Sequence, residues 1–153
     1  MLTILSLAPG QHHDRQGQAN ALSALGSLRC LTSDVAGAAD ALEAAPDIAR
    51  DIGDRGGEAE ALNEAGTLHR VRGDLSQSDA CHRQAFVLAR DIDSSRDETH
   101  AQAGLSRCAL AAGRMTDAQT GLRQAQEIFH RISAAEAASI SVELDALTDS
   151  GPA

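Results

Sequence analysis

The sequence predicts an all-α fold, a right-handed α-solenoid of three helix pairs followed by a C-terminal capping helix. The first observation behind this prediction is a 40-residue repeat without gaps, and the second is helical spacing of apolar residues inside each repeat. The third is composition, since 30 of the 153 residues are alanine and only two are aromatic. Small side chains let helix axes approach closely, so this composition suits stacked helix pairs.

The repeat covers residues 14–53, 54–93 and 94–133. The first two copies are identical at 14 of 40 aligned positions, and both end in Ala-Arg-Asp-Ile, at 49–52 and 89–92. An alanine-rich chain produces single matches by chance, but a gapless register that includes Asp-Arg, Gly and Ile indicates a true internal repeat.

The elements follow in order along the chain. Residues 1–13 align with the end of a repeat, so we interpret them as the remnant of a preceding helix or an irregular N-terminus. In the second repeat the apolar spacing predicts one helix over about 58–72 and another over about 75–92. Gly73-Asp74 between them supplies a break and an N-cap. Residues 134–148 predict the capping helix, and 149–153 form a tail.

Two residues depart from this regular pattern. Pro46 falls inside the second helix of the first repeat, where an interior proline is expected to kink or end the helix. Ser78 places a hydroxyl at a small packing position, which is tolerable if the hydroxyl bonds to a helix carbonyl.

Charge and composition exclude several functional classes. The chain has 13 basic residues, all arginine, against 22 acidic ones, and its net charge is −9. This charge argues against binding to nucleic acid or to anionic membranes, and the lack of lysine excludes a P-loop or a Schiff base. The three cysteines cannot pair completely, and no segment has a signal peptide's charged start or a membrane span's length. We therefore expect a cytoplasmic protein.

Certain residue types recur at fixed places in the three repeats. The middle of each first helix carries the pair Leu25-Gly26, Ala65-Gly66 or Leu105-Ser106. A small residue stands early in each second helix, at Ala38, Ser78 and Ala118, and an alanine stands late in it, at Ala45, Ala85 and Ala125. This pattern resembles the tetratricopeptide repeat (TPR) in its long, 40-residue form. The stretch from Gly53 to Asn63 is also similar to the C-terminal TPR region of large bacterial transcriptional regulators of the SARP/BTAD or NB-ARC type. The chain contains neither their nucleotide-switch motif nor a basic recognition helix, so only the role of the repeat region carries over.

The TPR resemblance implies a non-catalytic module that binds a protein or peptide in a concave groove lined by the first helix of each repeat. The candidate binding residues by motif register are Asn20, Ser23, Asn63, Thr67, Arg70, His100 and Arg107. The resemblance implies that Asn63 bonds to the backbone of a bound peptide. Arg70 and Arg107 suit an acidic peptide, since guanidinium groups bind carboxylates through paired donors. The alternative is that all these side chains are ordinary solvated helix positions.

Metal binding and catalysis have weaker support in the sequence. Cys81 and His82 are adjacent, so on a helix they diverge by about 100° and suit core packing better than one tetrahedral ion. The acidic clusters recur at each repeat junction among arginines, which indicates ion-paired junctions rather than one active site. We expect no enzyme activity, no metal and no cofactor.

Two alternatives to a general binding module stay open. One is that the chain is a sensory or autoinhibitory TPR fragment of a bacterial transcriptional regulator. The other is that it is a degenerate remnant of such a regulator. Because residues 1–13 offer no capping helix comparable to 134–148, the N-terminal face is also a candidate for self-association.

Overall fold

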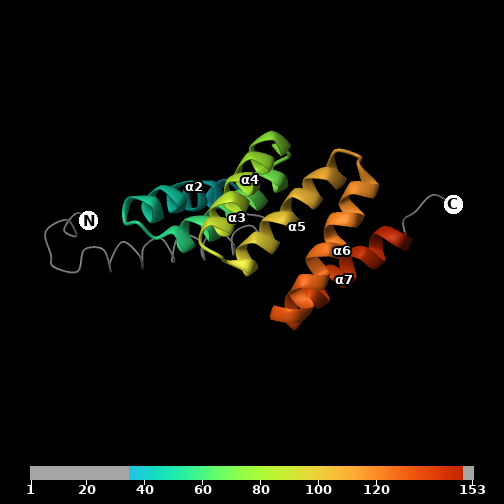
Figure 1. Cartoon of the computed structure of the whole chain (residues 1–153). Helices are drawn as coiled ribbons and strands as arrows, with labels where there is room; N and C mark the ends of the chain where they lie inside the picture. The colour runs from blue at the N-terminus through green and yellow to red at the C-terminus, as the bar shows by residue number, and fades with distance from the viewer. Residues whose placement is uncertain (1–34, 150–153) are drawn as a thin grey trace, which may run out of the picture.

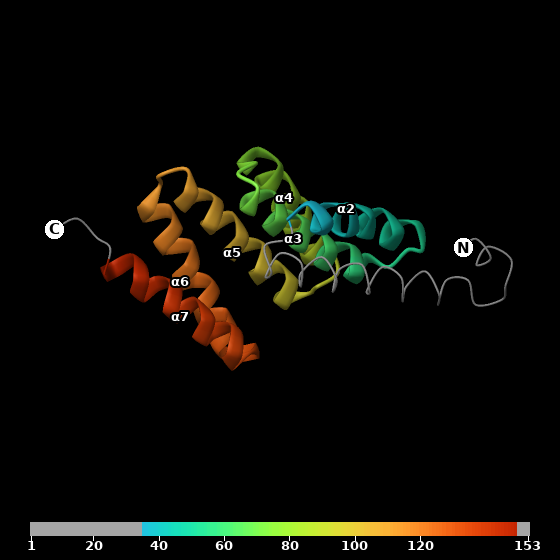
Figure 2. The same cartoon turned by 180° about the vertical axis from the view of Figure 1, so that it is seen from behind.

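The computed structural model describes residues 35–149, which fold into six consecutive α-helices (Figure 1). The helices are α2 (Val35–Asp51), α3 (Arg55–Val71), α4 (Leu75–Asp91), α5 (Ser95–Ala111), α6 (Met115–Ile132) and α7 (Ala134–Asp149). Within 35–149 there is no β-strand. The view from behind in Figure 2 shows the same extended stack of antiparallel neighbours. The predicted all-α solenoid is thereby confirmed. Residues 1–13, the first helix of the first repeat and residues 150–153 lie outside the described residues.

The helices stack in chain order. Each one packs against the helix before and the helix after it, and α3 additionally contacts α5 across α4. In the 40-residue register α3, α5 and α7 occupy the first-helix position, so they form one inner row. No Cα atom of α5 comes within 8 Å of a Cα atom of α7. Contact between this last pair therefore depends on long side chains.

Side-chain caps begin three of the helices. Asp54 and Asp74 accept the amide hydrogens of residues three positions later, and Ser94 does the same at the start of α5. After α3 the chain reverses at Gly73, whose φ of 84° is a left-handed conformation that glycine adopts without strain. The predicted Gly73-Asp74 break therefore lies where the register places it.

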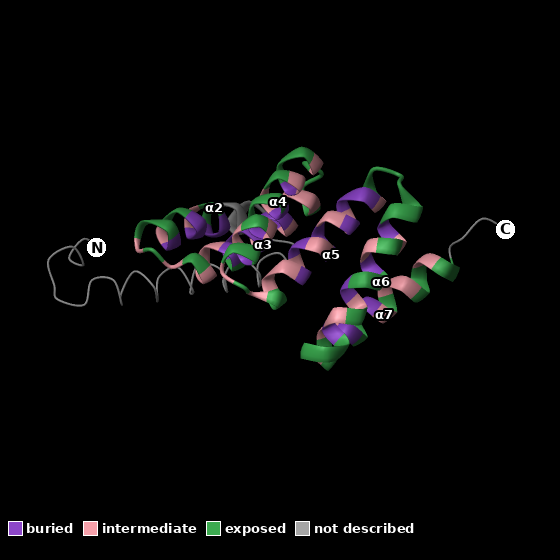
Figure 3. Ribbon diagram, viewed as in Figure 1, coloured by how far each residue is buried: buried purple, intermediate pink, exposed green. Residues whose placement is uncertain are grey.

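The core is built mostly from alanine. Each described helix has buried segments, which alternate with intermediate and exposed ones along the ribbon (Figure 3). One cluster joins Leu62 of α3, Ala85 of α4 and Ala101 of α5. The larger cluster joins α5, α6 and α7 through Ala103, Leu122, Ala125, Phe129, Ala137 and Ile140. Small side chains therefore set the helix spacing, as the composition predicts.

The two departures from the repeat pattern have different outcomes. Helix α2 continues through Pro46 to Asp51, so this proline does not end the helix. The Ser78 hydroxyl is completely buried and donates a hydrogen bond to the Gly66 carbonyl of α3, 2.7 Å away. It bonds to the facing helix rather than to its own, and so it holds α3 and α4 together. Its oxygen also lies 3.1 Å from the sulfur of the buried Cys108.

Candidate functional site

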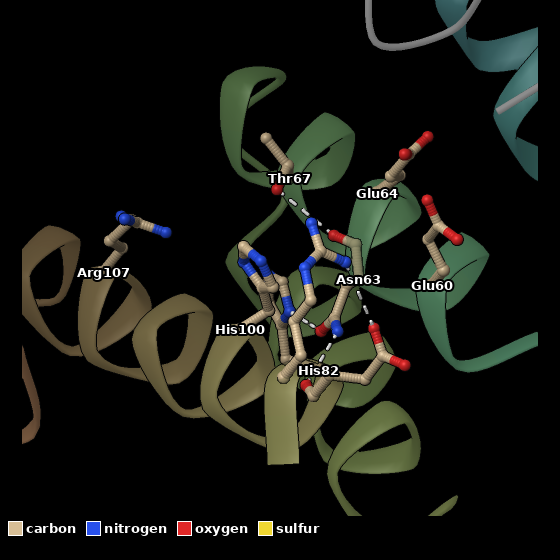
Figure 4. Close-up of a pocket in the computed structure, with 9 residues that line it drawn as sticks. Glu60, Asn63, Glu64, Thr67, His82, His100 and Arg107 are labelled. Carbon is tan, nitrogen blue, oxygen red and sulfur yellow. Dashed lines mark hydrogen bonds and ion pairs between the residues drawn. The ribbon is translucent and has the colours of Figure 1, made fainter. Parts of the chain in front are cut away.

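A polar pocket of about 140 Å³ lies between the inner helices α3 and α5 (Figure 4). It is lined by Glu60, Asn63, Glu64, Thr67, His82, Arg96, Asp97, His100 and Arg107. Four of the predicted binding residues meet here, namely Asn63, Thr67, His100 and Arg107. Arg70 is not among the lining residues, and Asn20 and Ser23 lie outside the described residues. The sequence register therefore brings four of the seven residues to one pocket, and their role in binding stays a prediction.

The Asn63 side chain connects three helices. Its amide nitrogen donates to the backbone carbonyl of Asp97 on α5 at 3.1 Å, and its amide oxygen lies 3.0 Å from Nδ1 of His82 on α4. Its exposed fraction is only 9%. Because the amide nitrogen points to a carbonyl, the oxygen must accept from the ring, so Nδ1 of His82 carries the hydrogen. Asn63 thus holds the pocket wall together and presents little of its own amide to the groove.

His82 fills the space between two glycines. Its ring is 2% exposed and lies where a side chain on Gly66 or Gly104 would otherwise stand. Burial lowers the pKa of His82 to about 4, and the nearby positive charges of Arg107 and Arg70 act in the same direction. The ring is therefore neutral at pH 7. Its Nε2 atom has no hydrogen-bond partner among residues 35–149.

Three basic side chains of α5 are already bonded to carboxylates of α7. Arg107 donates two hydrogen bonds to Glu143, from Nε at 2.8 Å and from its terminal nitrogen at 2.6 Å. Glu136 lies 2.7 Å from Nε2 of His100 and 3.0 Å from the guanidinium of Arg96. Such bidentate and shared contacts are among the stronger surface ion pairs.

The environment of Glu136 shows which of its contacts dominate. Partial burial raises the pKa of its carboxyl, but the hydrogen bonds from Ser133 and His100 and the charge of Arg96 outweigh it. The net result is a pKa below the usual range, so Glu136 is ionised at neutral pH. The polar contact between α5 and α7 therefore includes an ionised carboxylate.

Sequence reasoning did not place Glu64, His82, Arg96 and Asp97 at this pocket. His82 comes from a second helix and reaches the inner face only because Gly66 and Gly104 leave room for its ring. A signal for this was present, since a large side chain opposite glycines on both neighbouring helices indicates such an insertion. Arg96 and Asp97 lie in the first turn of α5, before the positions that the motif register considers.

The part of the chain that the structure describes offers no grouping of metal ligands and no membrane-spanning helix. No three His, Cys, Asp or Glu side chains there gather closely enough to hold a metal ion. None of the helices between residues 35 and 149 has the length and apolar character needed to cross a membrane. The predicted ion pairs at the repeat junctions are present. Arg50 is bonded to Glu58 at 2.9 Å, and the equivalent pair one repeat later, Arg90 and Glu98, is 3.8 Å apart.

Comparison with known proteins relates the chain to one architecture. No protein-family model matches it, and no curated protein does. Among solved structures it is similar to the TPR domain of FLU from Arabidopsis, with a TM-score of 0.68 and 13% sequence identity. The likeness covers 76% of this chain and 98% of that domain. At this level of identity the likeness is one of fold, and the chain has a TPR-like α-solenoid fold.

Proposed function

We propose that this chain is a non-catalytic module that binds a protein or peptide segment on the concave face between α3 and α5. The observation that carries the proposal is the meeting of four register-predicted residues in one polar pocket between successive first helices. Concave faces of repeat solenoids offer extended surfaces of this kind. The pocket combines carboxylates, an exposed guanidinium and a threonine hydroxyl, which suits a polar peptide segment rather than an apolar ligand.

The state of the titratable groups supports a binding role over a catalytic one. A general acid or base has to reach a substrate proton with its free nitrogen or oxygen. The ring of His82 is buried and bonded to Asn63, and that of His100 is bonded to Glu136. Arg107 donates to Glu143 from Nε and from one terminal nitrogen, and Arg96 donates to Glu136. These contacts fix the shape of the face and leave direct recognition to the more exposed Glu60 and Thr67.

The side chains at the pocket indicate the chemical class of the partner. The sequence assigns an acidic segment to Arg70 and Arg107. Of these two only Arg107 borders the pocket, together with His100, and an acidic segment there has to replace carboxylates that are already bound. The alternative function, in which the chain is the interaction region of a bacterial transcriptional regulator, uses the same face. This alternative predicts that a DNA-binding or nucleotide-switch region is encoded beside the chain.

The test is affinity capture from the native cell with a blocked groove. The variant Glu60→Arg/Thr67→Arg places two long cations on the inner face of α3. The matched control is Thr120→Arg/Glu127→Arg, which makes the same two replacements seven residues apart on the exposed face of α6. We expect the wild type and the control to recover the same partners and the groove variant to lose them. Equal recovery by the groove variant, with helicity unchanged, contradicts the assignment of this face.

A further inference from the structure

Two basic side chains of α5 and their carboxylate partners on α7 are equally spaced along the two helices. His100 and Arg107 are seven residues apart on α5, and their partners Glu136 and Glu143 are seven residues apart on α7. Seven residues make about two helical turns, or roughly 10 Å along the axis. Both pairs join residues 36 positions apart in the sequence, so the two helices run parallel with their charges in register.

Side chains alone hold this contact together on the concave side. No Cα atoms of α5 and α7 lie within 8 Å of each other, and α7 is anchored from behind, where Ala137 and Ile140 pack with Phe129 of α6. The charged contact remains open to water, since the Arg107 and Glu143 side chains are 26% and 35% exposed. Water and competing ions can therefore reach it, unlike a sealed core pair.

The basic side chains of α5 also line the binding face. Arg96, His100 and Arg107 all border the pocket between α3 and α5, and all three are held by glutamates of α7. A carboxylate ligand arriving at this face meets basic side chains whose donors are already occupied. Its binding free energy is reduced by whatever is needed to displace Glu136 and Glu143, because two ligands that use the same donors exclude each other.

We propose that α7 is a built-in occupant of the concave face, and that the partner is an acidic helical segment that competes with α7 for Arg96, His100 and Arg107. This inference rests on the proposed binding function and adds the partner's chemistry and the means of control. The recognised pattern is two carboxylates two turns apart on one face of a helix. Helix α7 itself carries this pattern, so its own sequence serves as the probe.

The experiment measures binding of a fluorescent peptide with the sequence of residues 134–149 to three full-length proteins. These are the wild type, Glu136→Gln/Glu143→Gln, and the control Asp145→Asn/Asp149→Asn, which removes two exposed charges of α7 without changing Glu136 or Glu143. The tethered α7 competes at high effective concentration, so we expect the first variant to bind at least about tenfold more tightly than the other two. Replacing both glutamates of the peptide by glutamine should abolish the gain.

A second measurement covers the case in which the variant folds poorly. Hydrogen exchange of the α7 amides in the wild type should accelerate when saturating peptide is added, since the peptide displaces the tethered helix. Equal affinity of all three proteins, no binding to any of them, or tight binding that survives loss of the peptide's carboxylates overturns the inference. The capture experiment with Glu60→Arg/Thr67→Arg leaves Glu136 and Glu143 in place, so its outcome decides the binding function separately.

Discussion

Acid should destabilise this fold through His82. In the folded chain the pKa of His82 is about 4, against an ordinary 6.5, because the ring is buried and faces Arg107, Arg70 and His100, with Asp79 opposing them. Between these two values the unfolded chain binds a proton that the folded chain does not, so stability is lost as the pH falls from 6.5 towards 4. The difference of about 2.5 units sets a limit of roughly 3 kcal/mol.

The measurement is urea unfolding followed by circular dichroism at about pH 7.5 and about pH 4.5. The carboxylates also titrate over this range, so the wild type is compared with His82→Asn, whose amide can donate to Asn63 in place of Nδ1 but does not titrate. We expect the wild type to lose about 2.5 kcal/mol more than the variant between the two pH values. Equal losses would refute the reasoning, because they would mean that His82 accepts a proton in the folded state at little cost.

Three further predictions concern packing and ion pairs. Gly104→Ala directs a methyl group into the His82 ring and should lower the free energy of unfolding by about 2 kcal/mol in urea titrations; adding His82→Ala should recover part of the loss. A double-mutant cycle with Arg107→Gln and Glu143→Gln should give a coupling of about 1 kcal/mol that shrinks at high salt, and additive losses would show that the bidentate contact contributes nothing. Ser78→Ala should lower the free energy of unfolding by about 1 kcal/mol or less in thermal unfolding, because the Gly66 carbonyl keeps its amide partner within the helix. A loss of stability several times larger would show that the Ser78 hydrogen bond is essential to the α3–α4 interface.

The fold was predictable because the signals that specify it are local and repeated. The spacing of Ala61, Leu62, Ala65 and Leu68 indicates an amphipathic helix, and all four are buried in α3. Gly73 marks the turn because its backbone requires a conformation that other residues adopt only under strain. A period of 40 residues then fixes the next pair from the first. Stacking follows, since each repeat exposes an apolar face that only a neighbour covers.

The site was predictable only in part, because its geometry depends on contacts between repeats. The register finds Asn63 and Arg107 as polar positions on first helices, and both do border the pocket. It does not reveal that Asn63 is bonded on both sides of its amide, nor that Arg107 already holds a carboxylate. Those partners come from other helices, and the pattern of polar positions along one helix contains no information about them.

The offset in sequence number between facing residues of neighbouring inner helices predicts which side chains meet across the repeats. The His100–Glu136 and Arg107–Glu143 contacts join residues 36 positions apart, four fewer than the repeat length, because facing side chains lean about one turn along the axis, whereas the longer Arg96 side chain reaches Glu136 across 40 positions. Applied one repeat earlier, the same offset sets Glu60 opposite Arg96 and Glu64 opposite His100, and all four residues border the pocket. Arg96 and His100 therefore lie between Glu60 and Glu64 of α3 and Glu136 of α7. An acidic helix that displaces α7 meets the same basic side chains, which makes this face suited to competition between a tethered helix and an incoming one.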